Sequence, residues 1–336
     1  MPDPADARRR YAPYGLETRP EARGLTRQEV ATRHGAAVVH HAGLPARPGD
    51  DGDGDEGAGA GAGAGVTVLL HGAAGSWTTW TPYLRAADET GRPVARPVLV
   101  DLPGWGDSPE PAVALDVEAA VDVVLEVADA LGVDRFDLVG HSMGALVALH
   151  LAARVPTRVT RLGLVSPTSF AALEATDRPL TGLVRLPALV LLRAVFAVLP
   201  RASSGLLRGA TRLGLLRPLS SPVFRHVRRV PRSVLEAFVA EIRPRGFVAA
   251  TRSAHGYDTT AWSRVACPVA AVAGADDAFA ERRDLARLRL VLPGARTTLL
   301  PRCGHFAHVE WPFATVDALA PTEPARAAAA DGEARA

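Results

Sequence analysis

The chain has 336 residues, and its 38 cationic side chains, which are all arginines, nearly balance 36 acidic ones. Because lysine is absent from the sequence, the composition excludes enzymes that form a Schiff base on a lysine, Ser-Lys hydrolases, and kinases or P-loop enzymes that bind phosphate with a lysine. The formal net charge of +2 predicts no general attraction to nucleic acid.

The cysteine content and the hydropathy pattern indicate the compartment. Cys267 and Cys303 are the two cysteines, which is too few for a disulfide framework. The first residues carry charge without the apolar segment of a signal peptide. The longest apolar run, residues 186–200, contains Arg193 and is too short to span a bilayer. We therefore expect a cytoplasmic protein with reduced thiols.

Low-complexity composition separates the ends and one internal segment from the rest of the chain. Residues 1–34 are polar and rich in arginine, which predicts a tail or one short helix. Residues 35–43 form a short β-like run. Residues 48–65 combine five acidic residues with a Gly-Ala repeat, which is typical of a flexible linker. Residues 321–336 are predicted to be a disordered tail.

From residue 66 onward, apolar strands alternate with amphipathic helices. This alternation predicts an α/β fold with a mostly parallel sheet flanked by helices, whose core has a first part at 35–167 and a second part at 264–320. Continuous apolar runs predict strands at 66–70, 97–101, 136–140, 161–165, 269–274 and 297–300. Helices are predicted at 117–131, at 142–154, near 281–292 and near 312–319.

The strand pattern stops between residues 168 and 263. This segment is rich in leucine and arginine, is interrupted by prolines, and contains 14 arginines against five acidic residues. We predict a helical cap inserted between the two parts of the core. Its charge predicts either a solvated arginine face above an apolar pocket or weak contact with an anionic membrane.

The strongest motif is Gly140-His141-Ser142-Met143-Gly144, which follows a predicted strand and opens a predicted helix. A Gly-x-Ser-x-Gly sequence in that position is typical of a nucleophile elbow, in which a sharp turn exposes the serine hydroxyl. The glycines at positions 140 and 144 flank this turn and prevent side-chain collisions. Ser142 is therefore the candidate nucleophile.

A serine nucleophile needs a base, and the base needs an acid that orients it. His305 follows the last predicted strand and is the candidate base, whereas the nearby His308 is expected to be structural. Asp276 and Asp277 both follow the strand at 269–274, and either could orient the imidazole of His305.

An oxyanion hole needs two backbone N–H groups beside the nucleophile. The N–H of Met143 is one candidate. The turn after the strand at 66–70 supplies the other, which we assign to Ala73, with Ala74 as the alternative. Ala74, Trp105 and His141 are the candidate substrate-binding residues.

The order of serine, aspartate and histidine, together with His71-Gly72-Ala73-Ala74-Gly75, resembles the alpha/beta-hydrolase superfamily, and more narrowly its capped alpha/beta-hydrolase-fold-1 group. Residues 101–108 (DLPGWGDS) and 304–312 (GHFAHVEWP) are similar to two further motifs of that group. In this group the acid lies three residues after a strand-end glycine, which implies Asp277 as the acid. The resemblance implies catalysis without a metal or a cofactor.

These residues predict a serine hydrolase that cleaves a small to medium apolar carboxylic ester through an acyl-enzyme. One alternative is hydrolysis of a carbon–carbon bond in a vinylogous diketone on the same residues. Another is a ligand-binding protein of the same fold without turnover. We expect a small-molecule partner, no nucleic acid, and a monomer or a homodimer.

Overall fold

The computed structural model describes residues 10–44, 65–199, 209 and 212–321. The two segments predicted to be a flexible linker and a disordered tail, residues 48–65 and 321–336, lie outside the described residues except for positions 65 and 321.

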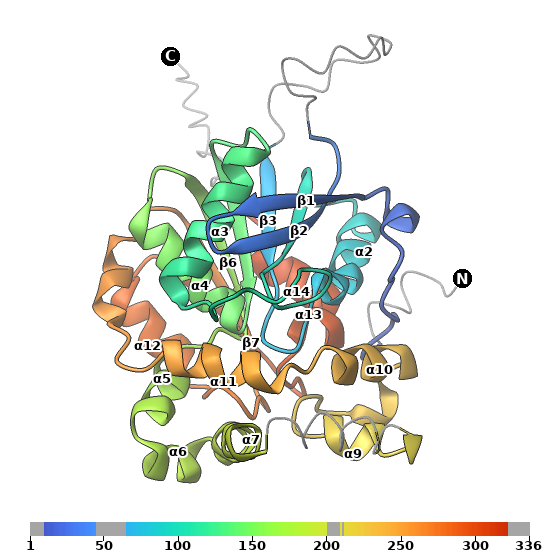
Figure 1. The fold of residues 1–336 in the computed structure, drawn as a ribbon, viewed down its shortest axis with the longest axis vertical. Helices are drawn as coiled ribbons and strands as arrows, with labels where there is room; N and C mark the ends of the chain where they lie inside the picture. Colours follow the sequence, from blue (N-terminus) through green and yellow to red (C-terminus); the bar gives the residue numbers. More distant parts are fainter. Residues whose placement is uncertain (1–9, 45–64, 200–208, 210–211, 322–336) are drawn as a thin grey trace, which may run out of the picture.

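The centre of the structure is an eight-stranded sheet with the order β1-β2-β4-β3-β5-β6-β7-β8 (Figure 1). The strands β3 to β8 run parallel to one another, and β2 joins them antiparallel through β4. The predicted α/β class with a mostly parallel sheet is confirmed. The strands are β1 (Thr26–Thr32), β2 (Gly35–His41), β3 (Val66–Leu70), β4 (Pro97–Asp101), β5 (Phe136–His141), β6 (Val159–Val165), β7 (Val269–Gly274) and β8 (Arg296–Leu300).

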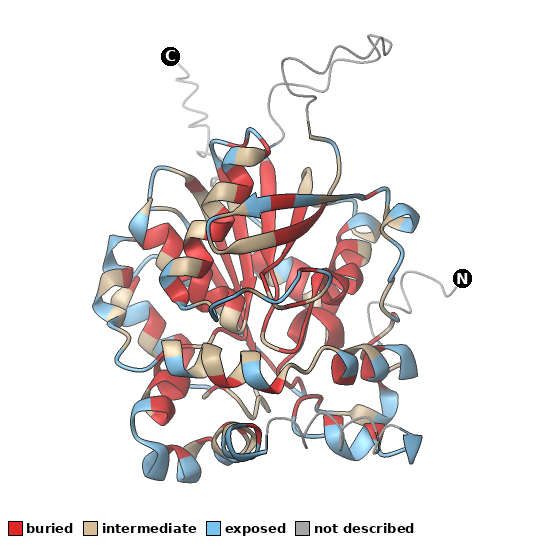
Figure 2. Cartoon of the chain, in the orientation of Figure 1, coloured by how far each residue is buried: buried red, intermediate tan, exposed pale blue. Residues whose placement is uncertain are grey.

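Helices cover both faces of this sheet, so that its central strands are buried (Figure 2). In β3, Val68 and Leu70 join the apolar cluster on one face, and Leu69 joins the cluster on the other. This two-sided burial explains why the strand is a continuous apolar run. One face carries α3 (Val117–Ala130), α4 (Met143–Arg154) and α12 (Asp284–Val291), and the other carries α2 (Thr81–Glu89), α13 (Ala307–Glu310) and α14 (Pro312–Leu319).

Local sequence sets the ends of helix α3. The Asp116 carboxylate accepts a hydrogen bond of 2.8 Å from the N–H of Ala119, which caps the first turn. After the helix, Gly132 adopts a φ of 69°, a left-handed conformation that glycine adopts without steric cost. The predicted helix at 117–131 therefore has the observed bounds within one residue.

The prediction of a tail or one short helix for residues 1–34 is wrong for the described part of that segment. A short 3-10 helix, η1 (Pro20–Arg23), precedes strand β1, which pairs antiparallel with β2 along its whole length. Val30 is the buried position of this edge strand, so the strand lacks the apolar pattern that reveals the others. Tyr11 and Tyr14 are also buried, which ties the segment to the core.

Between β6 and β7 the chain forms a group of helices, here called the helical insert (residues 168–263), at the end of the sheet shown lowest in Figure 1. Prolines occupy the first turns of several of its helices, where a missing N–H costs no hydrogen bond. The described elements are α5 (Phe170–Asp177), α6 (Pro179–Arg185), α7 (Pro187–Val198), α9 (Leu216–Ser220), η3 (Val227–Arg229), α10 (Arg232–Ala240), α11 (Pro244–Ser253) and η4 (Thr259–Arg264).

The two ends of the insert pack into the sheet core. Phe170 and Trp262 meet edge to face at 5.2 Å and belong to the same apolar cluster as α4.

Among the helices that the structure describes, none is both long and apolar enough to cross a membrane.

Candidate active site

Ser142 lies at the turn between β5 and α4 and has a φ of 53° and a ψ of −116°. A non-glycine residue in such a conformation is strained, and strain of this kind is typical of nucleophile elbows. The turn fits because its neighbours are glycines. A Cβ at Gly140 would lie 2.3 Å from the carbonyl oxygen of Gly144, and one at Gly144 would lie 2.5 Å from the carbonyl oxygen of Leu70.

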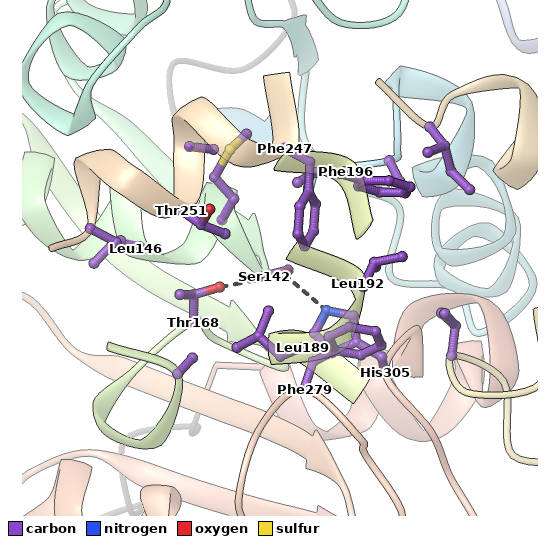
Figure 3. A pocket seen from close by; sticks show the side chains of 18 of the residues that line it. Ser142, Leu146, Thr168, Leu189, Leu192, Phe196, Phe247, Thr251, Phe279 and His305 are labelled. Atoms are coloured by element: carbon purple, nitrogen blue, oxygen red, sulfur yellow. Dashed lines mark hydrogen bonds between the residues drawn. The ribbon is translucent and has the colours of Figure 1, made fainter. Parts of the chain in front are cut away.

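Ser142, His305 and Asp277 form one hydrogen-bonded chain. The Oγ of Ser142 lies 2.8 Å from Nε2 of His305 (Figure 3). The other ring nitrogen, Nδ1, lies 2.8 Å and 3.0 Å from the two carboxylate oxygens of Asp277. The Asp277 side chain is only 1% exposed, so its charge is shielded from water and acts on the imidazole.

Asp276 takes no part in the hydrogen bonds that join Ser142, His305 and Asp277. Its carboxylate pairs with Arg225 at 2.9 Å and with Arg282 at 3.2 Å. Asp277 instead accepts the N–H of Phe279 at 2.8 Å in addition to its contact with His305. Of the two aspartates that the residues alone leave open, the structure places Asp277 against the histidine.

The loop that carries His305 is held by Glu310, a buried residue that the sequence analysis did not single out. The Glu310 carboxylate accepts the N–H groups of Gly304, Phe306 and Arg225 at 2.8, 3.2 and 3.1 Å. The hydroxyl of Tyr11 donates to the same carboxylate. Burial raises the pKa of Glu310, and these donors oppose that shift. The only sequence signal was its place in the GHFAHVEWP segment.

The helical insert also contacts this loop directly. The backbone N–H of His305 donates to the carbonyl oxygen of Val223 at 2.9 Å. A Cβ at Gly304 would lie 2.4 Å from that same oxygen. The position of the candidate base therefore depends on the insert as well as on the sheet.

The turn after β3 forms one wall beside Ser142. Ala73, Ala74 and Met143 line the same cavity as Ser142, and the turn is closed by a 3.0 Å hydrogen bond from the N–H of Gly75 to the carbonyl of Gly72. Ala74 adopts a φ of 78°. The N–H groups of Met143 and Ala73 stay the predicted donors to an oxyanion.

The buried side chain of His71 stabilises the turn after β3 through its hydrogen bonds. Burial lowers its pKa to about 4, so the imidazole is neutral near pH 7. Its Nδ1 lies 2.9 Å from the carbonyl oxygen of Gly72, and the N–H of Leu102 donates to Nε2 at 3.2 Å. The turn after β3 is therefore tied to the turn after β4.

The cavity at Ser142 has a volume of about 90 Å³ and is walled mainly by apolar side chains. Figure 3 shows Leu189, Leu192 and Phe196 of α7 on one side of the serine. Phe247 and Phe279 add aromatic walls. Apart from His305, the one ionisable side chain among the described lining residues is Arg243. The arrangement suits an apolar substrate with a polar group at the serine.

Two of the three predicted substrate-binding residues do not line this cavity, whereas Ala74 does. Trp105 lines a second cavity of about 630 Å³, which shares four residues with the first: Met143, Leu146, Arg243 and Ala250. His141 is 1% exposed, and its Nε2–H donates to the carbonyl oxygen of His305 at 3.1 Å. Side chains alternate along a strand, so the residue before Ser142 points to the opposite side.

His308, which we expect to be structural, lies in the interior. Its ring lies 4.5 Å from the ring of Trp80 and 4.4 Å from that of His141. Burial lowers the pKa of His308 to about 3. His308 is therefore neutral across the physiological range and supports the residues behind His305.

Within the described residues, His40, Asp101 and Asp107 are the one group close enough to share a metal ion. The two carboxylate oxygens of Asp101 already accept the N–H groups of Trp77 and Asp107 at 2.7 and 2.9 Å. Nε2 of His40 lies 3.2 Å from the carboxylate of Asp107. These contacts give the group a role in fixing the turn after β4.

A mostly parallel sheet with a serine at the sharp turn after β5 is the architecture of the alpha/beta hydrolases. The sequence agrees with the structure, because residues 67–318 match the alpha/beta hydrolase family. The chain belongs to this family and is a hydrolase.

The chain is 30% identical over 253 residues to a 2-hydroxy-6-oxononadienedioate/2-hydroxy-6-oxononatrienedioate hydrolase of Paraburkholderia phymatum, which covers 72% of this chain and 81% of the relative. A shorter match, 46% identical over 86 residues, links it to the pimeloyl-[acyl-carrier protein] methyl ester esterase of Neisseria meningitidis and covers 25% of this chain and 31% of the esterase.

Solved structures show the same fold at low identity. A thermophilic esterase from Thermogutta terrifontis superposes with a TM-score of 0.62 at 20% identity, covering 87% of this chain and 96% of the esterase. The enol-lactonase from Burkholderia xenovorans LB400 superposes with a TM-score of 0.61 at 20% identity, covering 87% of this chain and 99% of the lactonase.

Proposed function

We propose that the chain is a serine hydrolase that cleaves a carboxylic ester with an apolar acyl or alcohol part. The observation that carries this proposal is the hydrogen-bonded chain of Ser142, His305 and Asp277 at the wall of an apolar cavity. The helical insert acts as the cap that supplies most of the apolar wall. The free thiols of Cys267 and Cys303 fit a reducing, cytoplasmic location.

In the first half of the reaction, the Oγ of Ser142 attacks the ester carbonyl carbon while Nε2 of His305 takes the hydroxyl proton. The carboxylate of Asp277 holds Nδ1–H and stabilises the imidazolium that forms. The tetrahedral intermediate then expels the alcohol, which takes its proton from Nε2. The product of this half is an acyl-enzyme on Ser142.

In the second half, His305 takes a proton from water, and the hydroxide attacks the acyl carbon. The second tetrahedral intermediate collapses, releases the acid, and returns the proton to Oγ of Ser142. In both halves the N–H groups of Met143 and Ala73 are the proposed donors to the oxyanion. Removing one such donor typically lowers kcat about 10²–10³-fold.

The charge of the cavity favours an ester over the substrate named for the Paraburkholderia phymatum relative. That name describes a dioate, which carries two carboxylates. The described wall offers Arg243 as its one guanidinium, half-exposed and 3.4 Å from Glu241. A dianion would leave a carboxylate against apolar side chains, which is costly.

Carbon–carbon bond hydrolysis is the second candidate, because the relative at 30% identity covers most of this chain and is named as a hydrolase of a 2-hydroxy-6-oxo dienedioate. The enol and the ketone of such a compound form a vinylogous diketone. The same serine, histidine and aspartate would carry that reaction, and Arg243 would face the substrate carboxylate. The two candidate reactions therefore differ in the role of Arg243, which would bind a substrate carboxylate in carbon–carbon bond hydrolysis but not in the hydrolysis of a neutral ester.

Turnover of p-nitrophenyl esters of graded acyl length, compared with a 2-hydroxy-6-oxo dienoate, tests the proposal. We expect kcat/KM for the best ester to exceed that for the dienoate, and Ser142→Ala to abolish both activities. Arg243→Gln should leave a neutral ester nearly unaffected and raise KM for any carboxylated substrate. A preference for the dienoate would overturn ester hydrolysis.

Labelling with a fluorophosphonate separates an enzyme from a binding protein of the same fold. We expect the folded protein to be labelled at Ser142, and Ser142→Ala to remain unlabelled. A folded protein that resists the label and binds apolar ligands without turnover would support the non-catalytic alternative.

A further inference from the structure

The outer side of the helical insert exposes apolar side chains that have no covering element among the described residues. Of the thirteen large apolar side chains that are exposed in the described chain, ten lie between residues 180 and 219. Leu180, Val184 and Val198 are 86%, 84% and 76% exposed. The outer insert face is defined here by Leu180, Leu183, Val184, Leu191, Val195, Val198, Leu213, Leu215 and Leu219.

Helix α7 is apolar on both of its sides. Leu189, Leu192 and Phe196 line the cavity at Ser142, whereas Leu191 and Val195 on the outer side are 56% and 48% exposed. A helix that is apolar all round is normally covered all round. The exposed apolar side chains on the outer side of α7 therefore indicate that another apolar surface covers this side.

The charged side chains in the segment that forms the outer insert face are all positive. Residues 178–235 contain 11 arginines and not one acidic residue. Arg185 and Arg225 pair with carboxylates outside this stretch. Within the described residues, Arg212, Arg217, Arg228 and Arg229 are exposed and have no acidic partner within ion-pair distance.

We propose that the outer insert face docks on the surface of a phospholipid bilayer that contains anionic lipid. Helices α6, α7 and α9 lie along one edge of the molecule (Figure 1), so a single plane can touch all three. Apolar side chains enter the boundary between headgroups and acyl chains, and arginines bind the lipid phosphates. Helix α7 then separates the bilayer from the cavity at Ser142.

A second copy of the chain fits this face less well. In a symmetric dimer the same patch meets itself, which would bring the unpaired arginines of both copies together without an acidic residue between them. An anionic bilayer supplies the opposite charge and an apolar phase at once.

Vesicle flotation tests the docking without any need for turnover, so a failure of the proposed hydrolysis would leave its result intact. The probes are phosphatidylcholine vesicles with and without phosphatidylglycerol, at low and high salt. We expect binding to the anionic vesicles at low salt and weakening at high salt, because exposed charges are screened.

Two variants and two matched controls assign the binding to the face. The triple variant Val184→Gln, Leu191→Gln, Val195→Gln should weaken binding at least about tenfold. The triple variant Arg217→Gln, Arg228→Gln, Arg229→Gln should weaken binding to anionic vesicles by a similar factor. Leu290→Gln, at a side chain of α12 that is 82% exposed, and Arg289→Gln should leave binding unchanged.

Thermal unfolding of each variant verifies that the fold is retained. Failure of the wild-type protein to float with anionic vesicles at low salt would overturn the proposal. Equal binding of the apolar triple variant and the wild type would overturn it as well. A dimer in light scattering that the apolar variant dissociates, with no vesicle binding, would instead assign the face to contact between copies.

Discussion

The sheet core and the helical insert solve the burial of apolar side chains in opposite ways. In the core, all five residues of β3 are buried between two helix layers. In the insert, α7 places apolar side chains on the cavity and on the solvent side alike. The core covers its apolar surface within the chain, whereas the insert leaves part of its own exposed to the cavity and to solvent.

The core and the insert therefore have different roles at the candidate site. The core positions the serine, the histidine and the aspartate at the ends of strands, where backbone geometry is least free to change. The insert shapes the cavity through Leu189, Leu192 and Phe196. The separation is incomplete, because Val223 of the insert accepts the backbone N–H of His305.

The largest effect is expected in the core, at Asp277. Replacing Asp277 with Asn should lower kcat by about 10⁴-fold, because an amide stabilises the wrong tautomer of His305. Asp276→Asn is the matched control, since that carboxylate pairs with Arg225 and Arg282. Initial rates on the best ester measure both, and comparable losses for the two variants would contradict the assignment of Asp277.

A smaller effect on stability is expected where the core and the insert meet, at Glu310. Glu310→Gln turns an acceptor of several N–H groups into an amide that also donates. The free energy of unfolding should fall by about 2–3 kcal/mol, as measured by urea denaturation. Glu236→Gln, at an exposed residue that pairs with Arg232, should change it by less than about 1 kcal/mol.

A pH-dependent effect is expected behind the candidate base, at His308. Burial lowers its pKa to about 3, whereas an unfolded histidine has a pKa of about 6.5. As the pH falls through this window, the unfolded chain binds a proton that the folded chain does not. The contribution of His308 to the free energy of unfolding therefore falls by about 1.4 kcal/mol for each unit by which the pH drops between these two pKa values.

Replacing His308 with Phe should remove that contribution and flatten the stability curve between pH 6 and pH 4. Thermal unfolding across this range provides the measurement. His255→Gln, at an exposed position, should keep the wild-type slope. A slope that is unchanged in His308→Phe would show that other buried histidines, such as His71 and His141, carry the whole dependence.

The smallest effect is expected in the insert, at adjacent residues of α7. Leu192 lines the cavity, and Leu191 points outward with 56% exposure. Leu192→Ala should raise the preference for longer over shorter acyl chains by about tenfold, because it lengthens the pocket. Leu191→Ala should leave the ratio of kcat/KM values unchanged. An equal shift in both variants would remove the distinction between the two sides of α7.

The sequence predicted the buried strands well and the edge strand β1 poorly. Strands β3, β4 and β7 have the predicted bounds, because two-sided burial demands a continuous apolar run. Strand β1 has one buried position, Val30, and its remaining residues do not differ from those of a polar tail.

For the site, the motifs were sufficient to find Ser142 and His305, because each follows a recognisable strand. Asp277 required the family spacing, since Asp276 is chemically equivalent along the chain. Trp105 and His141 do not line the cavity at Ser142. His141 precedes Ser142 by one residue, and a one-residue step along a strand reverses the direction of a side chain. Trp105 lies in the turn after β4 and lines the adjoining cavity. Glu310 was missed since its donors, such as Tyr11, are remote in the sequence.

The amino-acid sequence by itself determined the sheet, the elbow and the class of chemistry, because these depend on short-range patterns of burial and turn geometry. Only the tertiary structure decided what holds the His305 loop and which side of α7 faces the cavity. Those outcomes depend on segments far apart in the chain, and the energies that fix them arise only when the segments pack together.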